Sequence, residues 1–201
     1  MRYDLVLFDL GGVLVEVESD RLMHTMAMLL NRPFDDIQDA VYHPELLLPF
    51  ELGRLGPQAY YEGLRTKLKL PWSYEQFVAA WNGIFRENRE VTHLMHRLRP
   101  CRKLMALSNT NVLHLGWIKA MVPSLSIFDD WVASCDVGLR KPDPAIYRLA
   151  LERAGVRADA AVYIDDRPEL VEAGRQVGLT AIHFESSRQL EEALQAIGLN
   201  M

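Results

Sequence analysis

Cysteine is scarce in this chain of 201 residues: only Cys101 and Cys135 occur, and they form no C-x-x-C pair and no metal-type spacing. Two such cysteines exclude a disulfide-rich scaffold and are typical of a reducing compartment. No apolar run approaches the roughly 20 residues that a membrane span requires. Asp4 and Asp9 interrupt the apolar stretch that a signal peptide would need. The sequence therefore predicts a cytoplasmic globular protein that does not associate with membranes.

Basic runs are also absent. Lysine and arginine total 22 and aspartate and glutamate total 27, so the formal net charge is -5. An acidic balance without a basic patch argues against nucleic acid as the main partner. Hydrophobic residues make up 49% of the chain, which is enough to build a packed core. The length allows one large domain, or a medium domain that carries a small one.

Five short segments are apolar on both faces, as expected for buried parallel strands. They span residues 4–8, 103–107, 131–135, 161–164 and 180–184. Helical patterns alternate with the later segments. One begins at Asp143, a suitable N-cap, and stops at Gly155; another begins with a predicted capping box of Ser186 and Gln189. This alternation predicts an α/β fold with a doubly wound, Rossmann-like parallel sheet of five strands.

Residues 16–99 show no convincing strand pattern. Apolar residues recur there at helical spacing, for example Leu22 and Met26, or Phe77 and Trp81 after a predicted Ser73/Gln76 capping box. A helical stretch of this size is too long for an ordinary crossover between strands. We therefore expect an inserted helical cap at 17–87 and a core domain formed by 1–16 and 88–201.

The carboxyl ends of the predicted strands carry polar side chains, and ligands bind at these ends in open parallel sheets. A carboxylate can attack phosphorus, carboxylate oxygens can hold Mg2+, and a hydroxyl or an ammonium group can bind phosphoryl oxygens. The residues at these ends, in chain order, are Asp9, Ser108, Asn109, Lys141, Asp165 and Asp166.

The segments around these residues resemble the four ordered motifs of the haloacid dehalogenase (HAD) superfamily. The matching segments are 8–14 (FDLGGVL), 107–109 (LSN), 141–143 (KPD) and 164–166 (IDD). The helical insert lies where that superfamily has its first type of cap. Three further segments, 50–53, 70–77 and 107–111, are similar to the small bacterial phosphatases typified by alpha-D-glucose-1-phosphate phosphatase.

The resemblance implies catalytic roles for four residues. Asp9 would be the nucleophile that forms an aspartyl-phosphate. Ser108, with Asn109 beside it, would bind the phosphoryl group. Lys141 would neutralise the charge of the nucleophile and of the phosphoryl group.

The resemblance also implies a Mg2+ site. Asp9 and Asp166 would be direct ligands, and Gly11 would contribute its backbone carbonyl. Asp165 would lie in the outer shell of ligands or share the metal.

Two positions depart from the superfamily pattern. Gly11 stands where most related phosphatases have an aspartate that acts as general acid and base, a function that contributes about 10²–10⁴-fold to rate. This glycine favours leaving groups that depart without strong protonation, such as the anomeric oxygen of a sugar 1-phosphate. Leu170 stands where many relatives have Asp or Asn, so we expect weaker positioning of the metal or of Lys141.

Several other polar residues are candidates for the substrate side. His114 follows the second motif, and His43, Glu51 and Arg54 lie in the predicted cap. The helical pair of His93 and His96 fits a solvated face better than a metal site.

The sequence as a whole predicts a Mg2+-dependent phosphatase that acts on a small phosphorylated metabolite, with a sugar phosphate such as glucose-1-phosphate favoured. We expect a monomer or homodimer. Two alternatives stay open. One is a haloacid dehalogenase, which needs no metal. The other is a catalytically weakened protein that binds a phosphorylated ligand.

Overall fold

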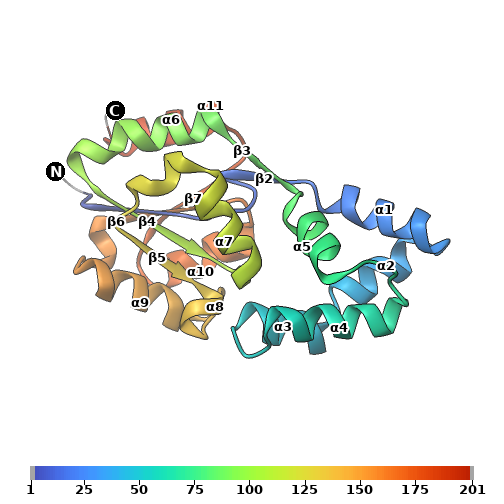
Figure 1. The fold of residues 1–201 in the computed structure, drawn as a ribbon. Helices are drawn as coiled ribbons and strands as arrows, with labels where there is room; N and C mark the ends of the chain where they lie inside the picture. The colour runs from blue at the N-terminus through green and yellow to red at the C-terminus, as the bar shows by residue number, and fades with distance from the viewer. Residues whose placement is uncertain (1–2, 200–201) are drawn as a thin grey trace.

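The computed structural model describes residues 3–199 and contains a five-stranded parallel sheet with helices on both faces (Figure 1). The strands lie in the order β5-β4-β1-β6-β7, and every neighbouring pair is parallel. Their bounds are β1 Leu5–Phe8, β4 Lys103–Ser108, β5 Asp130–Ala133, β6 Ala161–Asp165 and β7 Thr180–His183. The predicted α/β class and number of strands in this sheet are confirmed.

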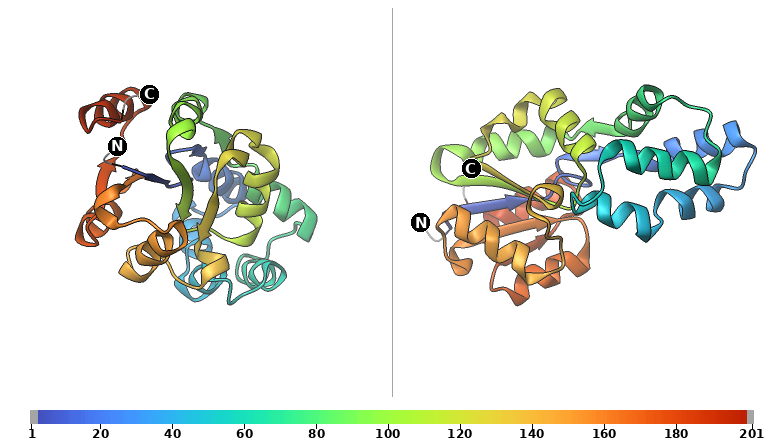
Figure 2. Two further views of the ribbon diagram at one scale, coloured as in Figure 1. Left: turned by 90° about the vertical axis from the view of Figure 1, so that its left-hand side faces the viewer. Right: turned by 60° about the horizontal axis from the view of Figure 1, so that its bottom comes forward.

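Two layers of helices bury the sheet. One face packs against α6 (Arg89–Leu98), α7 (Val112–Met121) and α11 (Ser187–Ala196). The other face packs against α9 (Pro144–Ala154) and α10 (Pro168–Gln176). Figure 2 shows these layers on either side of the strands. Because both faces are covered, all four residues of β1 are buried, which explains its unbroken apolar sequence.

Five helices form a separate group next to the sheet, and we call them the cap helices. They are α1 (Ser19–Leu30), α2 (Phe34–Val41), α3 (Pro44–Glu51), α4 (Pro57–Leu68) and α5 (Tyr74–Asn82). They have an apolar core of their own, in which Tyr60 stacks on Phe50 with ring centroids 4.4 Å apart. Figure 1 shows this group at the end of the molecule opposite the labelled chain termini.

A two-stranded antiparallel ribbon connects the cap helices to the rest of the chain, and the expectation of no strand within residues 16–99 is wrong. The ribbon consists of β2 (Val15–Val17) and β3 (Phe85–Glu87). Each strand has three residues, which is too short to produce a recognisable alternation in the sequence. The preceding helix α5 ends at Asn82, three residues before β3 begins.

The predicted helix ends are largely confirmed. The Asp143 side chain accepts a hydrogen bond from the Ala145 N–H at 2.8 Å, and Gly155 is the left-handed C-cap of α9. Ser73 and Gln76 form a complete capping box. At α11 the box is only half formed.

The Ser186 hydroxyl accepts from the Gln189 N–H, but the Gln189 side chain accepts from the N–H of Glu185 instead of that of Ser186.

Within residues 3–199, no helix is both long and apolar enough to cross a membrane.

The third predicted strand extends too far. Ser134 and Cys135 belong to the short helix α8 (Ser134–Val137), so β5 ends at Ala133. The Ser134 hydroxyl bonds both the N–H and the carbonyl of Thr110, each at 2.9 Å. The backbone therefore turns away from the sheet at this point because the side chain is held by the neighbouring loop.

Candidate active site

Four of the predicted residues meet at the carboxyl edge of the sheet. The Lys141 ammonium lies 3.0 Å from Asp9 Oδ1 and 2.6 Å from Asp165 Oδ2. Lys141 is 1% exposed and Asp165 is fully buried, while Asp9 and Ser108 are nearly so. A charged lysine is stable in such a place only when carboxylates pair with it. The buried charges are thus held at the end of β1 and β6, as the parallel topology predicts.

The backbone of Lys141 is fixed by Asn109. The Asn109 side-chain amide donates to the Lys141 carbonyl at 2.9 Å, and its side-chain oxygen accepts from the Lys141 N–H at 2.8 Å. These two bonds occupy both ends of the amide. In this arrangement the Asn109 side chain orients the backbone of Lys141. The role of Asn109 beside Ser108 in phosphoryl binding stays a prediction.

Asp165 has partners on both of its oxygens. Its Oδ2 accepts from Lys141 and from the Tyr163 hydroxyl, and its Oδ1 accepts from the Arg167 N–H at 2.9 Å. We did not single out Tyr163 from the sequence. A signal existed, because residues two apart on a strand point to the same face. A tyrosine two positions before an acidic strand end can therefore reach the carboxylate.

Leu170 takes no polar contact through its side chain, which is buried on α10. Its carbonyl accepts a hydrogen bond from the Tyr147 hydroxyl at 3.0 Å. Tyr147 in turn packs edge-on against Tyr163 with ring centroids 5.4 Å apart. The contact that an aspartate or asparagine would offer is absent here, and the Tyr163 hydroxyl bonds Asp165 instead.

Three carboxylates form a group that could hold a metal ion. Asp9, Asp165 and Asp166 each offer an oxygen, and these oxygens lie within 4.8 Å of one another. Gly12, at φ +80°, approaches this group so closely that an added Cβ would lie 2.2 Å from Asp166 Oδ2. Oxygen donors of this kind suit Mg2+. Hydrogen bonds already occupy both oxygens of Asp165. The oxygens of Asp9 and Asp166 are therefore more available to bind a metal ion.

The electrostatics favour a cation at the same place. Burial raises the pKa of the Asp9 carboxyl to about 6; Asp165 adds to this rise, while Lys141 and the Ser108 hydroxyl oppose it. Burial, followed by the charge of Asp165, also raises the pKa of Asp166. Lys141 contacts two of the three carboxylates, and the charge of Arg167 also lowers the pKa of Asp166, so two positive charges face three negative ones. A divalent cation would stabilise their ionised forms.

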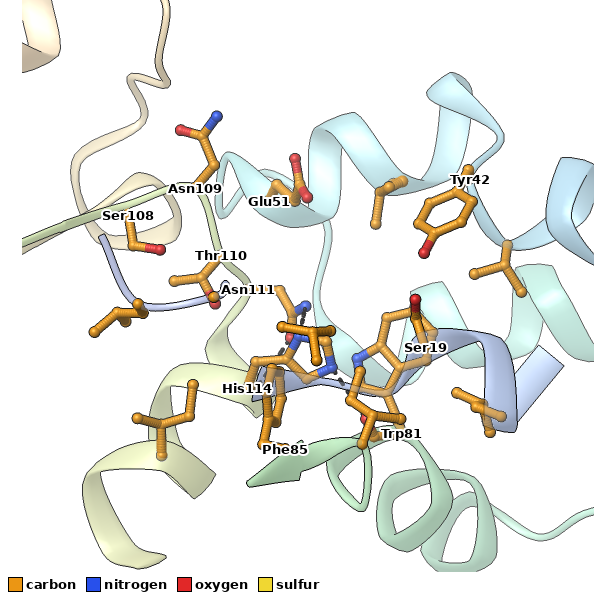
Figure 3. A pocket seen from close by; sticks show the side chains of 18 of the residues that line it. Ser19, Tyr42, Glu51, Trp81, Phe85, Ser108, Asn109, Thr110, Asn111 and His114 are labelled. Carbon is orange, nitrogen blue, oxygen red and sulfur yellow. Dashed lines mark hydrogen bonds between the residues drawn. The ribbon is translucent and has the colours of Figure 1, made fainter. Parts of the chain in front are cut away.

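A cavity of about 190 Å³ extends from Gly11 and Ser108 to the cap helices (Figure 3). Glu51 and His114 line it, as expected for residues on the substrate side. Glu51 also pairs with Arg140 at 3.3 Å across the cap and the core. Arg54 is exposed, and His43 lies 3.8 Å from Glu45 outside this cavity.

His114 joins α7 to the cap. Its Nε2 lies 3.1 Å from the Trp81 carbonyl, and its Nδ1 lies 3.0 Å from the Asn111 side-chain nitrogen. Since a carbonyl only accepts and an amide nitrogen only donates, the proton is on Nε2. The ring also stacks on Trp81 at 4.9 Å. Burial lowers the pKa of His114 to about 3, so the ring is neutral near pH 7.

The parallel sheet, its acidic strand ends and the inserted helices define a class of proteins with a Rossmann-like core and a helical cap. The chain belongs to the haloacid dehalogenase-like hydrolase family, whose sequence model matches residues 3–178.

Two relatives and one solved structure are similar to nearly the whole chain. A D-ribitol-5-phosphate phosphatase of Bacteroides thetaiotaomicron is 23% identical, over 96% of this chain and 97% of the relative. A sesquiterpene phosphatase of Aspergillus oryzae is 24% identical, over 92% and 91%. A HAD family enzyme of Bacteroides thetaiotaomicron, solved with magnesium and inorganic phosphate, shares the fold with a TM-score of 0.81. It is 24% identical and the match covers 91% of this chain and 94% of that chain.

Proposed function

We propose that this protein is a Mg2+-dependent phosphatase that hydrolyses the phosphate monoester of a small metabolite through Asp9. The observation that carries the proposal is the buried contact of Asp9 with Lys141 at 3.0 Å, next to Ser108 and the paired aspartates. Family membership and the two phosphatase relatives support the same reaction class. Because the match covers nearly the full length of these relatives, it includes both the core and the cap helices.

In the first step, a carboxylate oxygen of Asp9 attacks phosphorus and the bond from phosphorus to the ester oxygen breaks. The leaving oxygen keeps the electron pair and takes a proton from water, because Gly11 offers no acid. Lys141 and the Ser108 hydroxyl bind the phosphoryl oxygens as charge develops on them. The product is an aspartyl-phosphate on Asp9 and a free alcohol.

In the second step, water attacks phosphorus and the bond from phosphorus to the Asp9 oxygen breaks. This step restores the Asp9 carboxylate and releases inorganic phosphate. The cap helices line the cavity mainly with apolar side chains, so the charged groups act beside a medium of low polarity.

Asp9, Asp166 and the Gly11 carbonyl would hold the Mg2+, and Asp165 would support the site through Lys141. When bound, Mg2+ would neutralise the negative charges that otherwise repel phosphate from the Asp9 carboxylate. Lys141 supplies the positive charge that the protein itself contributes there.

For the substrate, the sequence favours a sugar phosphate such as glucose-1-phosphate. The relatives support a phosphate monoester in general, because one is named for a polyol phosphate and the other for sesquiterpenes. Esters of an acidic hydroxyl suit Gly11 best in either case, since such oxygens leave without a proton donor.

The test is phosphate release from a panel of phosphate monoesters, with Mg2+ and with a chelator. The panel contrasts glucose 1-phosphate with glucose 6-phosphate, ribitol 5-phosphate and phenyl phosphate. We expect turnover only with Mg2+, at least 10³-fold lower in Asp9→Asn and unchanged in Asp4→Asn, which carries the same substitution at an exposed site. Metal-independent turnover that survives Asp9→Asn would contradict the proposal.

The two alternatives give different results in the same experiment. A haloacid dehalogenase would release halide from 2-haloacids without Mg2+. A binding protein would bind phosphate esters and release no phosphate with any metal. The paired aspartates Asp165 and Asp166 favour the phosphatase over the dehalogenase. The intact set of Asp9, Ser108, Lys141 and Asp166 favours it over the binding protein.

A further inference from the structure

We propose that the organic part of the substrate is a small, mainly apolar group, and that an aryl phosphate monoester fits the site better than a sugar phosphate. This inference rests on the proposed function, because it assumes that the phosphoryl group binds at Ser108 and Lys141. It concerns the cavity beyond that group, between Gly11 and the cap helices.

Apolar side chains form most of the cavity wall beyond the strand ends. They come from the ribbon, from α1 to α3, from α5 and from α7. These residues are Val17, Leu22, Met23, Val41, Leu47, Trp81, Ile84, Phe85 and Ile118. An alcohol that enters this space loses its contact with water and gains contacts mainly with carbon, which favours an apolar body.

The polar side chains of the cavity are mostly committed to the protein. Both ends of the Asn109 amide bond the Lys141 backbone. The Asn111 side chain accepts from Leu113 and His114 N–H groups and donates to the His114 ring. The other nitrogen of His114 bonds the Trp81 carbonyl. The acceptor oxygens of the two amides and both ring nitrogens of His114 are therefore engaged within the protein, and within residues 3–199 each amide keeps a single free N–H.

Few free hydroxyl groups remain for a substrate. Among the residues that line the cavity, Ser19 and Tyr42 lie at its far end from Ser108 in Figure 3, and Thr110 lies close to Ser108. A sugar hydroxyl would have to find one of these few hydroxyls, the Glu51 carboxylate or the Trp81 N–H, which is unpaired among the described residues. Each buried hydroxyl that is left unpaired weakens binding by roughly fivefold or more. One polar substituent at the far end of an apolar body, by contrast, could still bind Tyr42 or Ser19.

The cavity has the size of a small ring system. Its volume is about 190 Å³, while apolar cavities of about 150 Å³ take up one benzene molecule. Trp81 and Phe85 contribute flat aromatic surface to the wall, and Trp81 is itself held in place by stacking on His114. A flat aromatic body therefore matches the walls in both shape and size.

The position next to Gly11 supports the same class of substrate. A Cβ built on Gly11 would lie 3.3 Å from Val17 Cγ2, so an apolar group covers the place where relatives of this family have an acid. Because residue 11 is a glycine, the leaving oxygen receives no proton from a side chain at this position. Phenolic hydroxyls have a pKa of about 10, so aryl oxygens leave readily as anions, whereas ordinary aliphatic alcohols need protonation.

The test measures binding rather than turnover, so that the greater chemical reactivity of aryl esters does not enter. Inorganic phosphate, phenyl phosphate, glucose 1-phosphate and ribitol 5-phosphate are titrated calorimetrically into Asp9→Asn with Mg2+. All four share the phosphoryl group, so differences in Kd report the organic part alone. We expect phenyl phosphate to bind at least tenfold more tightly than inorganic phosphate, and the two polyol esters no more tightly than inorganic phosphate. Tighter binding of either polyol ester than of phenyl phosphate would overturn the inference, and so would an absence of binding by phenyl phosphate.

A matched pair of variants tests whether the apolar wall is the cause. Met23 and Met26 lie one turn apart on α1 and both are buried, but only Met23 lines the cavity. In an Asp9→Asn background, Met23→Gln should weaken phenyl phosphate binding at least fivefold and leave inorganic phosphate unchanged. Met26→Gln, which places the same polar group in the core of the cap helices, should change neither Kd. Equal losses in the two variants would overturn the role of the wall. If neither variant folds, the ranking of the four Kd values still tests the proposal.

Failure of this inference is distinguishable from failure of the proposed function. If the wild type releases no phosphate from any ester, the phosphatase is contradicted while the ranking of Kd values can still favour an apolar ligand. If the wild type is a phosphatase but glucose 1-phosphate binds more tightly than phenyl phosphate, only the inference about substrate class fails.

Discussion

At the scale of single residues, the acidic edge of the sheet depends on close backbone contacts as well as on charges. Gly12 allows Asp166 to approach the chain after β1, since a Cβ there would lie 2.2 Å from Asp166 Oδ2. Tyr163 and Lys141 hold Asp165 from two directions. The geometry of the predicted Mg2+ site therefore rests on residues that are not themselves ligands.

We predict that Gly12→Ala displaces Asp166 and raises the Mg2+ concentration for half-maximal activity by at least tenfold. Gly155→Ala is the matched control. Both glycines have a positive φ, at +80° and +66°, but an added Cβ at Gly155 meets nothing within 4 Å. Both variants should lose roughly 1 kcal/mol of stability from backbone strain, measured by urea unfolding. Equal Mg2+ dependence in the two variants would show that the close contact is irrelevant to the metal.

Tyr163→Phe removes the hydroxyl that donates to Asp165 and keeps the ring. We expect kcat to fall about tenfold, with a smaller change in KM, because Asp165 then holds Lys141 less firmly. Tyr147→Phe also removes one buried hydroxyl, but that group bonds the Leu170 carbonyl instead. The comparison of kcat between these two variants separates positioning of Asp165 from loss of stability. A Tyr147→Phe defect as large as that of Tyr163→Phe would refute the assignment.

The residues at the strand ends were predictable because each depends on a short local pattern, an apolar run followed by a polar side chain. Asp9, Ser108 and Asp165 were found in this way. The contact of Asn109 with the Lys141 backbone was not predictable, because it joins segments 32 residues apart that meet only when β4 and the loop after α8 are in place. The same is true of the cavity wall, to which the ribbon and five helices contribute.

At the scale of elements, two connections between the cap helices and the core stand out. The chain enters and leaves the cap helices through the β2–β3 ribbon. The sequence did not predict this ribbon because its strands are too short to show a periodic pattern. His114 on α7 forms the second connection, through its bond to the Trp81 carbonyl on α5. A neutral ring suits both of its partners, so protonation of His114 would break at least one of the two bonds.

This connection predicts a dependence of stability on pH. The pKa of His114 is about 3 in the folded state, against 6.5 for an unperturbed histidine. Only the unfolded state takes up this proton between those values, so stability is complete above pH 6.5 and falls as the pH drops below it. Between pH 7.5 and 4.5, the wild type should lose about 2 kcal/mol more than His114→Gln, measured by urea unfolding. If the free energy of unfolding fell equally with pH in the wild type and in His114→Gln, this would contradict the assignment of His114 as a buried, neutral ring.

At the scale of the whole molecule, the chain combines a parallel sheet that gathers charged side chains with a helical insert that covers them. The fold class could be predicted because apolar runs alternate with helical patterns along most of the core. The bounds of the cap helices α2 and α3 could not be predicted, since each has only eight residues and α3 contains Pro49. What the two parts enclose is a cavity with phosphoryl-binding groups at one end and carbon along most of its wall.

The central claim is that Asp9 attacks phosphorus, and the most direct test is to trap the covalent intermediate. Wild-type protein turning over a radiolabelled phosphate monoester with Mg2+ is quenched in acid, digested and mapped by mass spectrometry. The account predicts an acid-stable, base-labile phosphate on the peptide that contains Asp9, and its absence in Asp9→Asn. Turnover without any label on that peptide, or with label on another residue, would contradict the account.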